Sequence, residues 1–146
     1  MKPRPETRAV LVHEIADARA ALAAARALGL DVALVSPASG AASLGAGWWQ
    51  AMLRQMAAEY PEVQVTAILD CGTRAELVQA ALRQGLVDIC YRGPAAVARK
   101  LADIAGQHGA RLHRRLPQTL DLTGVADREA ACRNWLTKKG HRRAAG

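Results

Sequence analysis

Short apolar runs alternate with Ala- and Leu-rich periodic stretches along most of the chain. Residues 9–13 form the first run, and apolar residues then recur every three or four positions from Ile15 to Ala25, with Gly29 at the end of the stretch. A β-branched run followed by such a stretch is typical of a strand followed by an amphipathic helix. The pattern predicts four strand–helix units between residues 8 and 109.

The second unit pairs a strand over residues 31–37 with a helix that starts near Gly47. Four large side chains recur at every fourth position of that stretch, which places them on one helical face: Trp48, Met52, Met56 and Tyr60. Pro61 is expected to end the helix, since proline cannot continue it.

The third and fourth units have recognisable helix starts. Residues 63–69 predict a strand, and Thr73 followed three positions later by Glu76 predicts a capping box. Residues 87–91 predict the fourth strand, with Asp88 at its exposed mouth. Pro94 is expected at the first position of the next helix, where its missing N–H is not needed.

The last quarter of the chain predicts an edge strand and a final helix. Charges interrupt the apolar pattern of residues 111–116, which is how an edge strand avoids pairing with other molecules. Asp127 is expected to cap a helix that carries Trp135 on its apolar face, as an anchor of this helix or a subunit contact. Residues 138–146 predict a basic disordered tail.

These elements predict an α/β protein: a three-layer α-β-α arrangement with a five-stranded, mostly parallel sheet of flavodoxin-like or Rossmann-like order, plus a C-terminal helix. The doubly wound domain is assigned to residues 8–117, and a helical extension packed on it to residues 118–137. A chain of 146 residues with 51% hydrophobic content is sufficient for one buried core.

Charge is unevenly distributed along the chain. Residues 1–91 carry 8 Lys/Arg against 9 Asp/Glu, whereas residues 92–146 carry 12 against 4. Clustered cations attract nucleic acid, anionic membranes or acidic partners. Nucleic-acid modules also interleave stacking aromatic residues, and only Trp135 follows Tyr91, which favours solvated elements over a nucleic-acid interface.

The sequence predicts a cytoplasmic protein. The amino-terminal residues lack the pattern of a signal peptide, and no stretch approaches the ~20 apolar residues of a membrane span. Three cysteines at unrelated positions fit a reducing compartment better than a disulfide framework. No Cys-x-x-Cys occurs, which argues against a structural zinc site.

The candidate site lies where parallel strands end, since open parallel sheets bind ligands outside the carboxyl ends of their strands. With strand order 2-1-3-4-5, the loops after the first and third strands would meet, with His13 and Glu14 opposite Asp70 and Cys71. This group would be a Cys–His nucleophile pair or a magnesium site. The alternative is structural, with His13 and Asp70 satisfying backbone groups and Cys71 packed in the core.

The loop after the second strand consists almost wholly of small residues, which would let the backbone approach an anion next to a helix N-terminus. It lacks the Lys-Ser/Thr ending of a Walker loop and the third glycine of a dinucleotide fingerprint, so no cofactor is assigned. A flexible lid or a subunit contact is an equal alternative. The predicted ligand-binding residues are Ser36, Ser39, Gly40, Ser43, Gly45, Gly47, Tyr91, Arg92 and Gly93.

Residues 8–117 resemble a response-regulator receiver domain. Asp70 stands at the phospho-acceptor place, Glu14 at one position of the acidic pair, and residues 115–117 near the family's Lys-Pro. The resemblance implies phosphorelay with magnesium. The sequence departs from the family where His13 replaces an acid, and Tyr91 with Arg92 replaces Ser or Thr.

Two further interpretations stay open at this stage. The same β-α units build the walls of TIM barrels, so a half-barrel that pairs with a second copy is an alternative fold. A non-enzymatic protein would instead use its Trp-bearing helices and basic tail to contact a partner or to form a homo-oligomer. The function that the sequence favours is binding of a small anionic metabolite, such as a phosphate or carboxylate, at the strand-end crevice.

Overall fold

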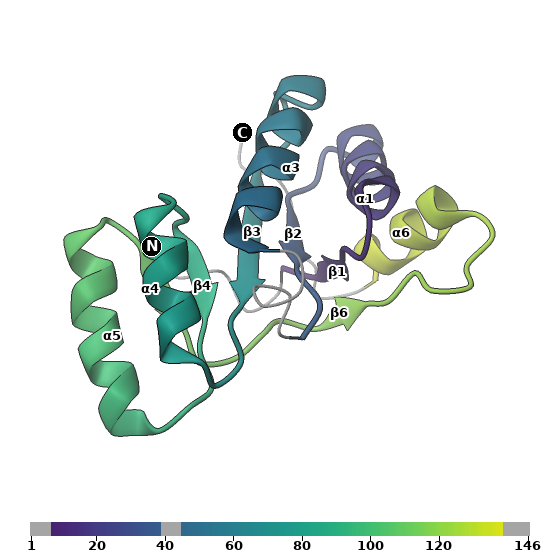
Figure 1. Ribbon diagram of the computed structural model, residues 1–146. Helices are drawn as coiled ribbons and strands as arrows, with labels where there is room; N and C mark the ends of the chain where they lie inside the picture. Colours follow the sequence, from purple (N-terminus) through teal and green to yellow (C-terminus); the bar gives the residue numbers. More distant parts are fainter. Residues whose placement is uncertain (1–6, 39–44, 139–146) are drawn as a thin grey trace. The chain divides into compact units, whose positions relative to one another are not determined.

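The computed structural model describes residues 7–38 and 45–138 (Figure 1). In this part of the chain, six strands form one parallel sheet in the order β5-β4-β3-β2-β1-β6. The strands are β1 (Ala9–Leu11), β2 (Val32–Val35), β3 (Val65–Asp70), β4 (Asp88–Cys90), β5 (Arg111–His113) and β6 (Thr119–Leu120). The helices are α1 (Ile15–Leu28), α3 (Gly45–Glu59), α4 (Ala75–Arg83), α5 (Ala95–Gln107) and α6 (Arg128–Leu136).

The predicted α/β class and the Rossmann-like layered arrangement are confirmed. The residues form two compact units, each with most of its contacts inside itself. The β4 unit comprises the described parts of Ser36–Ala51 together with Ile68–Leu116, and the β1 unit comprises the described parts of Pro3–Val35, Met52–Ala67 and Pro117–Gly146. The two units are described separately below.

The β1 unit has a core of small and branched side chains. All four residues of β2 are buried, and the predicted stripe of α1 is buried at Ala18, Leu22 and Ala25. Gly29 ends α1 with φ 64°, a left-handed conformation that glycine adopts without strain. The indole N–H of Trp135 donates to the carbonyl of Ala9 at 2.9 Å, which confirms Trp135 as an anchor of α6.

In the β4 unit, the strand register separates two faces of the sheet. Ile89 of β4 is paired with Leu112 of β5, and Asp88 with Arg111. Side chains alternate between faces along a strand, so Leu112 and Ile89 share one face and Asp88 and Arg111 the other. Helix α5 lies on the Leu112 face, because Leu112 and α5 line one hollow.

The strand order and the last strands differ from the sequence prediction. The order 2-1-3-4-5 is not observed, because β2 lies between β1 and β3. Strands β1 to β5 instead follow one another in chain order, as the units of a barrel wall do, and β6 pairs with the other side of β1. The predicted strand over residues 111–116 ends at His113, and β6 was not predicted because two paired residues leave no alternation to detect.

Three local predictions are corrected or confirmed by the cap geometry. Helix α4 begins after Arg74 without a side-chain cap, so the capping box at Thr73 is not formed. Pro94 is the N-cap of α5 and lies one position before the predicted place. Asp127 caps α6 as predicted, since its Oδ1 accepts from the N–H of Ala130 at 3.0 Å.

Candidate functional site

At the end of β3, Asp70 is buried and all its bonds are internal to the β4 unit. Its Oδ1 accepts from the N–H of Gly72 at 2.9 Å, and its Oδ2 accepts from Nη2 of Arg92 at 2.8 Å. Its own N–H donates to Oγ of buried Ser36 at 2.8 Å. The structure therefore brings together three predicted site residues, Ser36, Asp70 and Arg92, with the carboxylate already neutralised by the guanidinium.

The end of β4 is held by a cation that the sequence analysis did not select. Arg114, directly after β5, donates to the carbonyls of Tyr91 at 2.9 Å and Gly93 at 2.7 Å. Its guanidinium carbon lies 5.6 Å from the centre of the Tyr91 ring. Hydrogen bonds from a charged donor are about twice as strong as neutral ones, so Arg114 fixes the loop from Tyr91 to Gly93 that leads into α5.

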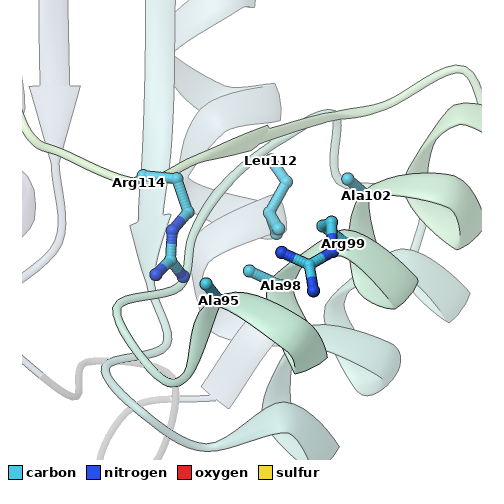
Figure 2. Close-up of a pocket in the computed structure, with 6 residues that line it drawn as sticks. All are labelled: Ala95, Ala98, Arg99, Ala102, Leu112 and Arg114. Atoms are coloured by element: carbon cyan, nitrogen blue, oxygen red, sulfur yellow. The ribbon is translucent and has the colours of Figure 1, made fainter.

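A hollow of about 250 Å³ lies beside this loop, between α5 and β5 (Figure 2). Its floor is apolar, and Figure 2 shows Leu112 pointing from β5 toward the alanines of α5. The guanidinium groups of Arg99 and Arg114 flank it. The lining residues are Ala95, Ala98, Arg99, Ala102, Leu112 and Arg114.

The two arginines of the hollow differ in how they are held. Arg114 is fixed by two carbonyls and still has N–H groups to spare, because a guanidinium has five. The Arg99 side chain makes no hydrogen bond or ion pair with the residues that the structure describes, and it is exposed. One cation is thus preorganised, and the other is free to close on an anion.

His13 and Glu14, which follow β1, have partners in the β1 unit. His13 Nε2 lies 3.4 Å from Asp121 Oδ1, and Arg128 Nη1 donates to Glu14 Oε1 at 2.7 Å. The N–H groups of His13 and Glu14 donate to Oδ2 of Asp17, the acid of the α1 capping box. This end of β1 faces the end of β6, so the predicted arrangement of His13 and Glu14 opposite Asp70, which assumed β1 beside β3, is not the one that the sheet order produces.

The turn that follows β6 lowers the pKa of the Asp121 carboxyl group. The N–H and hydroxyl of Thr123 donate to its Oδ1 at 2.9 and 2.7 Å. These bonds, with a smaller contribution from His13, hold the pKa of Asp121 below its usual value. Asp121 therefore remains a carboxylate beside His13 over the physiological range.

Cys71 has the surroundings of a packed thiol. It is fully buried, and burial, with a further contribution from the nearby carboxylate of Asp70, raises its pKa to about 12. A nucleophilic cysteine needs the opposite change, since only the thiolate attacks. Burial likewise raises the pKa of Cys90 to about 11 and that of Cys132 to about 12.

We expect all three thiols of the native protein to react with an aromatic disulfide reagent at pH 8 at least roughly a hundredfold more slowly than those of the unfolded chain. Burial keeps the reagent away from the sulfur atoms and lowers the fraction of each thiol that is ionised. The measurement is absorbance of the released thiol with and without denaturant. A single thiol that reacts rapidly in the native protein would restore Cys71 as a nucleophile candidate; mass spectrometry of the labelled peptide identifies which cysteine reacted.

The remaining predicted residues are accounted for individually. Ser39, Gly40 and Ser43 lie outside the described residues, as do residues 139–146 of the predicted tail. Gly45 and Gly47 lie in the first turn of α3, and an added Cβ at either would meet nothing within 4 Å. Asp88 is buried and not at an exposed mouth: it bonds Arg111 and His113 at 2.8–2.9 Å.

Several cations of the basic second half of the chain are paired. The bonded carboxylates reduce the positive surface that a polyanion would meet. The pairs are Arg92–Asp70, Arg111–Asp88, Arg128–Glu14 and Arg133–Glu129. The excess of Lys and Arg in this segment therefore overstates its unpaired positive charge. Arg99 and Arg114, which have no carboxylate partner among the described residues, flank the apolar hollow.

Searches of the described part of the chain give two negative findings. No three His, Cys, Asp or Glu side chains within residues 7–38 and 45–138 are placed to hold a metal ion. No described helix is long and apolar enough to cross a membrane.

The described residues form an α/β protein with a parallel sheet and, between α5 and β5, an apolar-floored hollow flanked by two arginines. No protein-family model matches the chain, and no curated protein does.

Proposed function

We propose that the protein binds a small anionic metabolite in the hollow between α5 and β5. The observation that supports this is the pairing of two guanidinium groups, from Arg99 and Arg114, on either side of an apolar floor. Arginine presents a planar fork of donors that matches a carboxylate or a phosphate. Small-molecule sites combine an apolar lining with a few polar groups in just this way.

The position of the hollow in the fold supports the same proposal. Ala95 is the first residue of α5, after the loop that ends β4, and Arg114 is the first residue after β5. Two of the lining residues thus lie near the carboxyl ends of neighbouring parallel strands, the edge where α/β sheets bind ligands, and the others lie along α5 and within β5. The sequence pattern predicted an anion contact at this edge from Arg92, and Arg92 bonds Asp70 instead of lining the hollow.

The proposal is one of binding. The side chains that line the hollow are arginine, alanine and leucine, and a guanidinium keeps its proton at every physiological pH. Proton transfer or nucleophilic attack would need a group of another kind. A carrier, a sensor or a regulatory module is therefore favoured over an enzyme.

Replacing Arg99 with glutamine is expected to weaken binding of benzoate by about fivefold, because a charge pair at an exposed site contributes up to about 1 kcal/mol. NMR titration that follows the signals of Leu112 and Ala98 measures the dissociation constant. Arg99 is exposed and makes no described side-chain bond, so the substitution leaves stability unchanged.

Lys100→Gln is the matched control for this experiment. It removes the same charge from the adjacent exposed position of α5, which does not line the hollow. Its titration is expected to match that of the unaltered protein within about twofold, the effect of general charge alone. Equal weakening in the two variants, or no saturable shift at Leu112 with benzoate or inorganic phosphate, would contradict the proposed site.

A further inference from the structure

The floor of the hollow offers a ligand only apolar surface. Three alanines of α5, at positions 95, 98 and 102, recur along one helical face, and Leu112 closes the hollow from β5. The backbone N–H of Ala98 donates to the carbonyl of Pro94 at 2.9 Å, in the first turn of α5. Arg99 and Arg114 are the two lining residues whose side chains are polar.

An inorganic anion gains little from such a site. Exposed charge pairs contribute little in water, since solvent and salt screen them. Arg99 is exposed, and Arg114 already shares its donors with two carbonyls.

The size of the hollow sets a second limit. Its volume of about 250 Å³ is below the roughly 300–1,000 Å³ of sites for drug-sized ligands. A nucleotide or a long acyl chain would leave most of its surface in water. The hollow accommodates a short apolar body whose charged end reaches the rim.

We infer that the ligand is a small organic acid, with one carboxylate held between Arg99 and Arg114 and a compact apolar body on the alanines and Leu112. This inference rests on the proposed function and narrows it to one class of ligand. Affinity then comes from burial of the apolar body, while the arginines select the charge and fix the orientation.

A homologous series of straight-chain carboxylates tests the inference, with the full chain titrated with acetate, propionate, butyrate and pentanoate at constant ionic strength. The dissociation constant is expected to fall about threefold with each added methylene, slightly less than for complete burial of the group. NMR signals of Leu112 and Ala98 report the constant and locate the ligand. Inorganic phosphate is titrated as the anion that has no apolar body.

A cavity-filling pair of variants separates the floor from the arginines. Ala102→Leu puts a larger side chain into the hollow at an exposed helix position, and Ala96→Leu puts the same side chain on exposed α5 surface outside the lining. Ala102→Leu is expected to weaken pentanoate about tenfold and phosphate less than twofold. Ala96→Leu is expected to change neither, and both variants keep the melting temperature, since leucine and alanine are both good helix formers.

The outcomes distinguish this inference from the proposed function. If phosphate and acetate bind in an Arg99-dependent way but pentanoate binds no tighter than acetate, the anion site stands and the organic-acid inference is overturned. If neither the acids nor phosphate produces a saturable shift at Leu112, both are overturned. Threefold steps along the series that Ala102→Leu abolishes and Ala96→Leu preserves would establish the ligand class.

Discussion

Replacing Gly93 with alanine is expected to lower the free energy of unfolding by about 3 kcal/mol, since overpacking a filled site costs about this much. An added Cβ would lie 2.9 Å from Cε1 of Tyr91 and nearer still to its Cζ and hydroxyl. The Tyr91 ring cannot easily move aside, because it is 2% exposed and Arg114 holds the backbone on both sides of the clash. Thermal or urea denaturation measures the change.

Gly106 supplies the matched control within the same helix–loop segment. It lies in α5, and an added Cβ there would meet nothing within 4 Å. Gly106→Ala is expected to stabilise the protein by about 0.5–1 kcal/mol, because alanine restricts the unfolded chain and favours the helix. Equal effects of the two substitutions would contradict the packing argument.

A double-mutant cycle identifies the cause of the Gly93 effect. Tyr91→Ala removes the ring that the new Cβ would strike, and is itself destabilising because a buried ring leaves a cavity. In that background Gly93→Ala is expected to cost less than about 1 kcal/mol, so the two changes are strongly non-additive. Additive losses would mean that the clash with Tyr91 is not what excludes a side chain at Gly93.

Replacing Asp88 with asparagine is expected to destabilise the protein by about 3 kcal/mol, because removing one partner leaves buried charges uncompensated. Asp88 is 3% exposed, and both its oxygens bond Arg111 at 2.9 Å while Oδ1 also bonds Nε2 of His113 at 2.8 Å. In the variant, the asparagine NH₂ group replaces one acceptor oxygen with a donor, and this donor faces the N–H groups of the Arg111 guanidinium. The Arg111 side chain is 35% exposed, so water partly solvates its charge in the variant. The expected loss of stability is therefore at the lower end of the range for broken buried ion pairs.

The same variant makes a prediction for acid unfolding. Burial acts to raise the pKa of Asp88, but the hydrogen bonds from His113 and Arg111 outweigh it and hold the pKa below its ordinary value. The carboxylate therefore stabilises the fold fully above the unfolded pKa near ~3.9, and this part of the stability is lost as the pH falls through the lower folded pKa. In Asp88→Asn that loss at acid pH is expected to be absent.

Asp103→Asn is the control for Asp88. Asp103 lies on an exposed position of α5. Its replacement is expected to change stability by less than about 0.5 kcal/mol. Urea unfolding at pH 7 and again near pH 3 tests both variants. An Asp88→Asn variant as stable as Asp103→Asn at pH 7 would contradict a stabilising role for the Asp88 cluster.

The sequence predicted much of the β-α succession because each unit carries its own periodicity. The stripe of α1 and its exit at Gly29 were predicted correctly, as were the cap of α6 at Asp127 and the anchoring role of Trp135. These features depend on residues close together in the chain, so local propensity is enough to specify them. Strand β6 is the exception, since two residues next to β1 become a strand only by pairing with it.

The sequence located candidate residues at the strand ends but not how they pair. Ser36, Asp70 and Arg92 were each expected after a strand, and Ser36 and Arg92 both bond Asp70 in the structure. Arg99 and Arg114 were not selected, because 15 positions separate them in the chain and neither belongs to a motif. The only sequence signal was the excess of Lys and Arg after residue 91, which does not distinguish a paired cation from a free one.

The sequence by itself determined the class of fold, because hydrophobic periodicity and helix caps are local signals. Together they specify which segments become strands and which become helices. Only the tertiary structure decided the order of the strands, since the pairing of β6 with β1 and not with β5 is a contact between residues far apart in the sequence. The tertiary structure also decided which charges are neutralised. Asp70 forms an ion pair with Arg92, and Asp88 forms one with Arg111, whereas Arg99 lines an apolar hollow. Pairing of this kind depends on distances of a few ångströms between elements distant in sequence, and no local pattern encodes them.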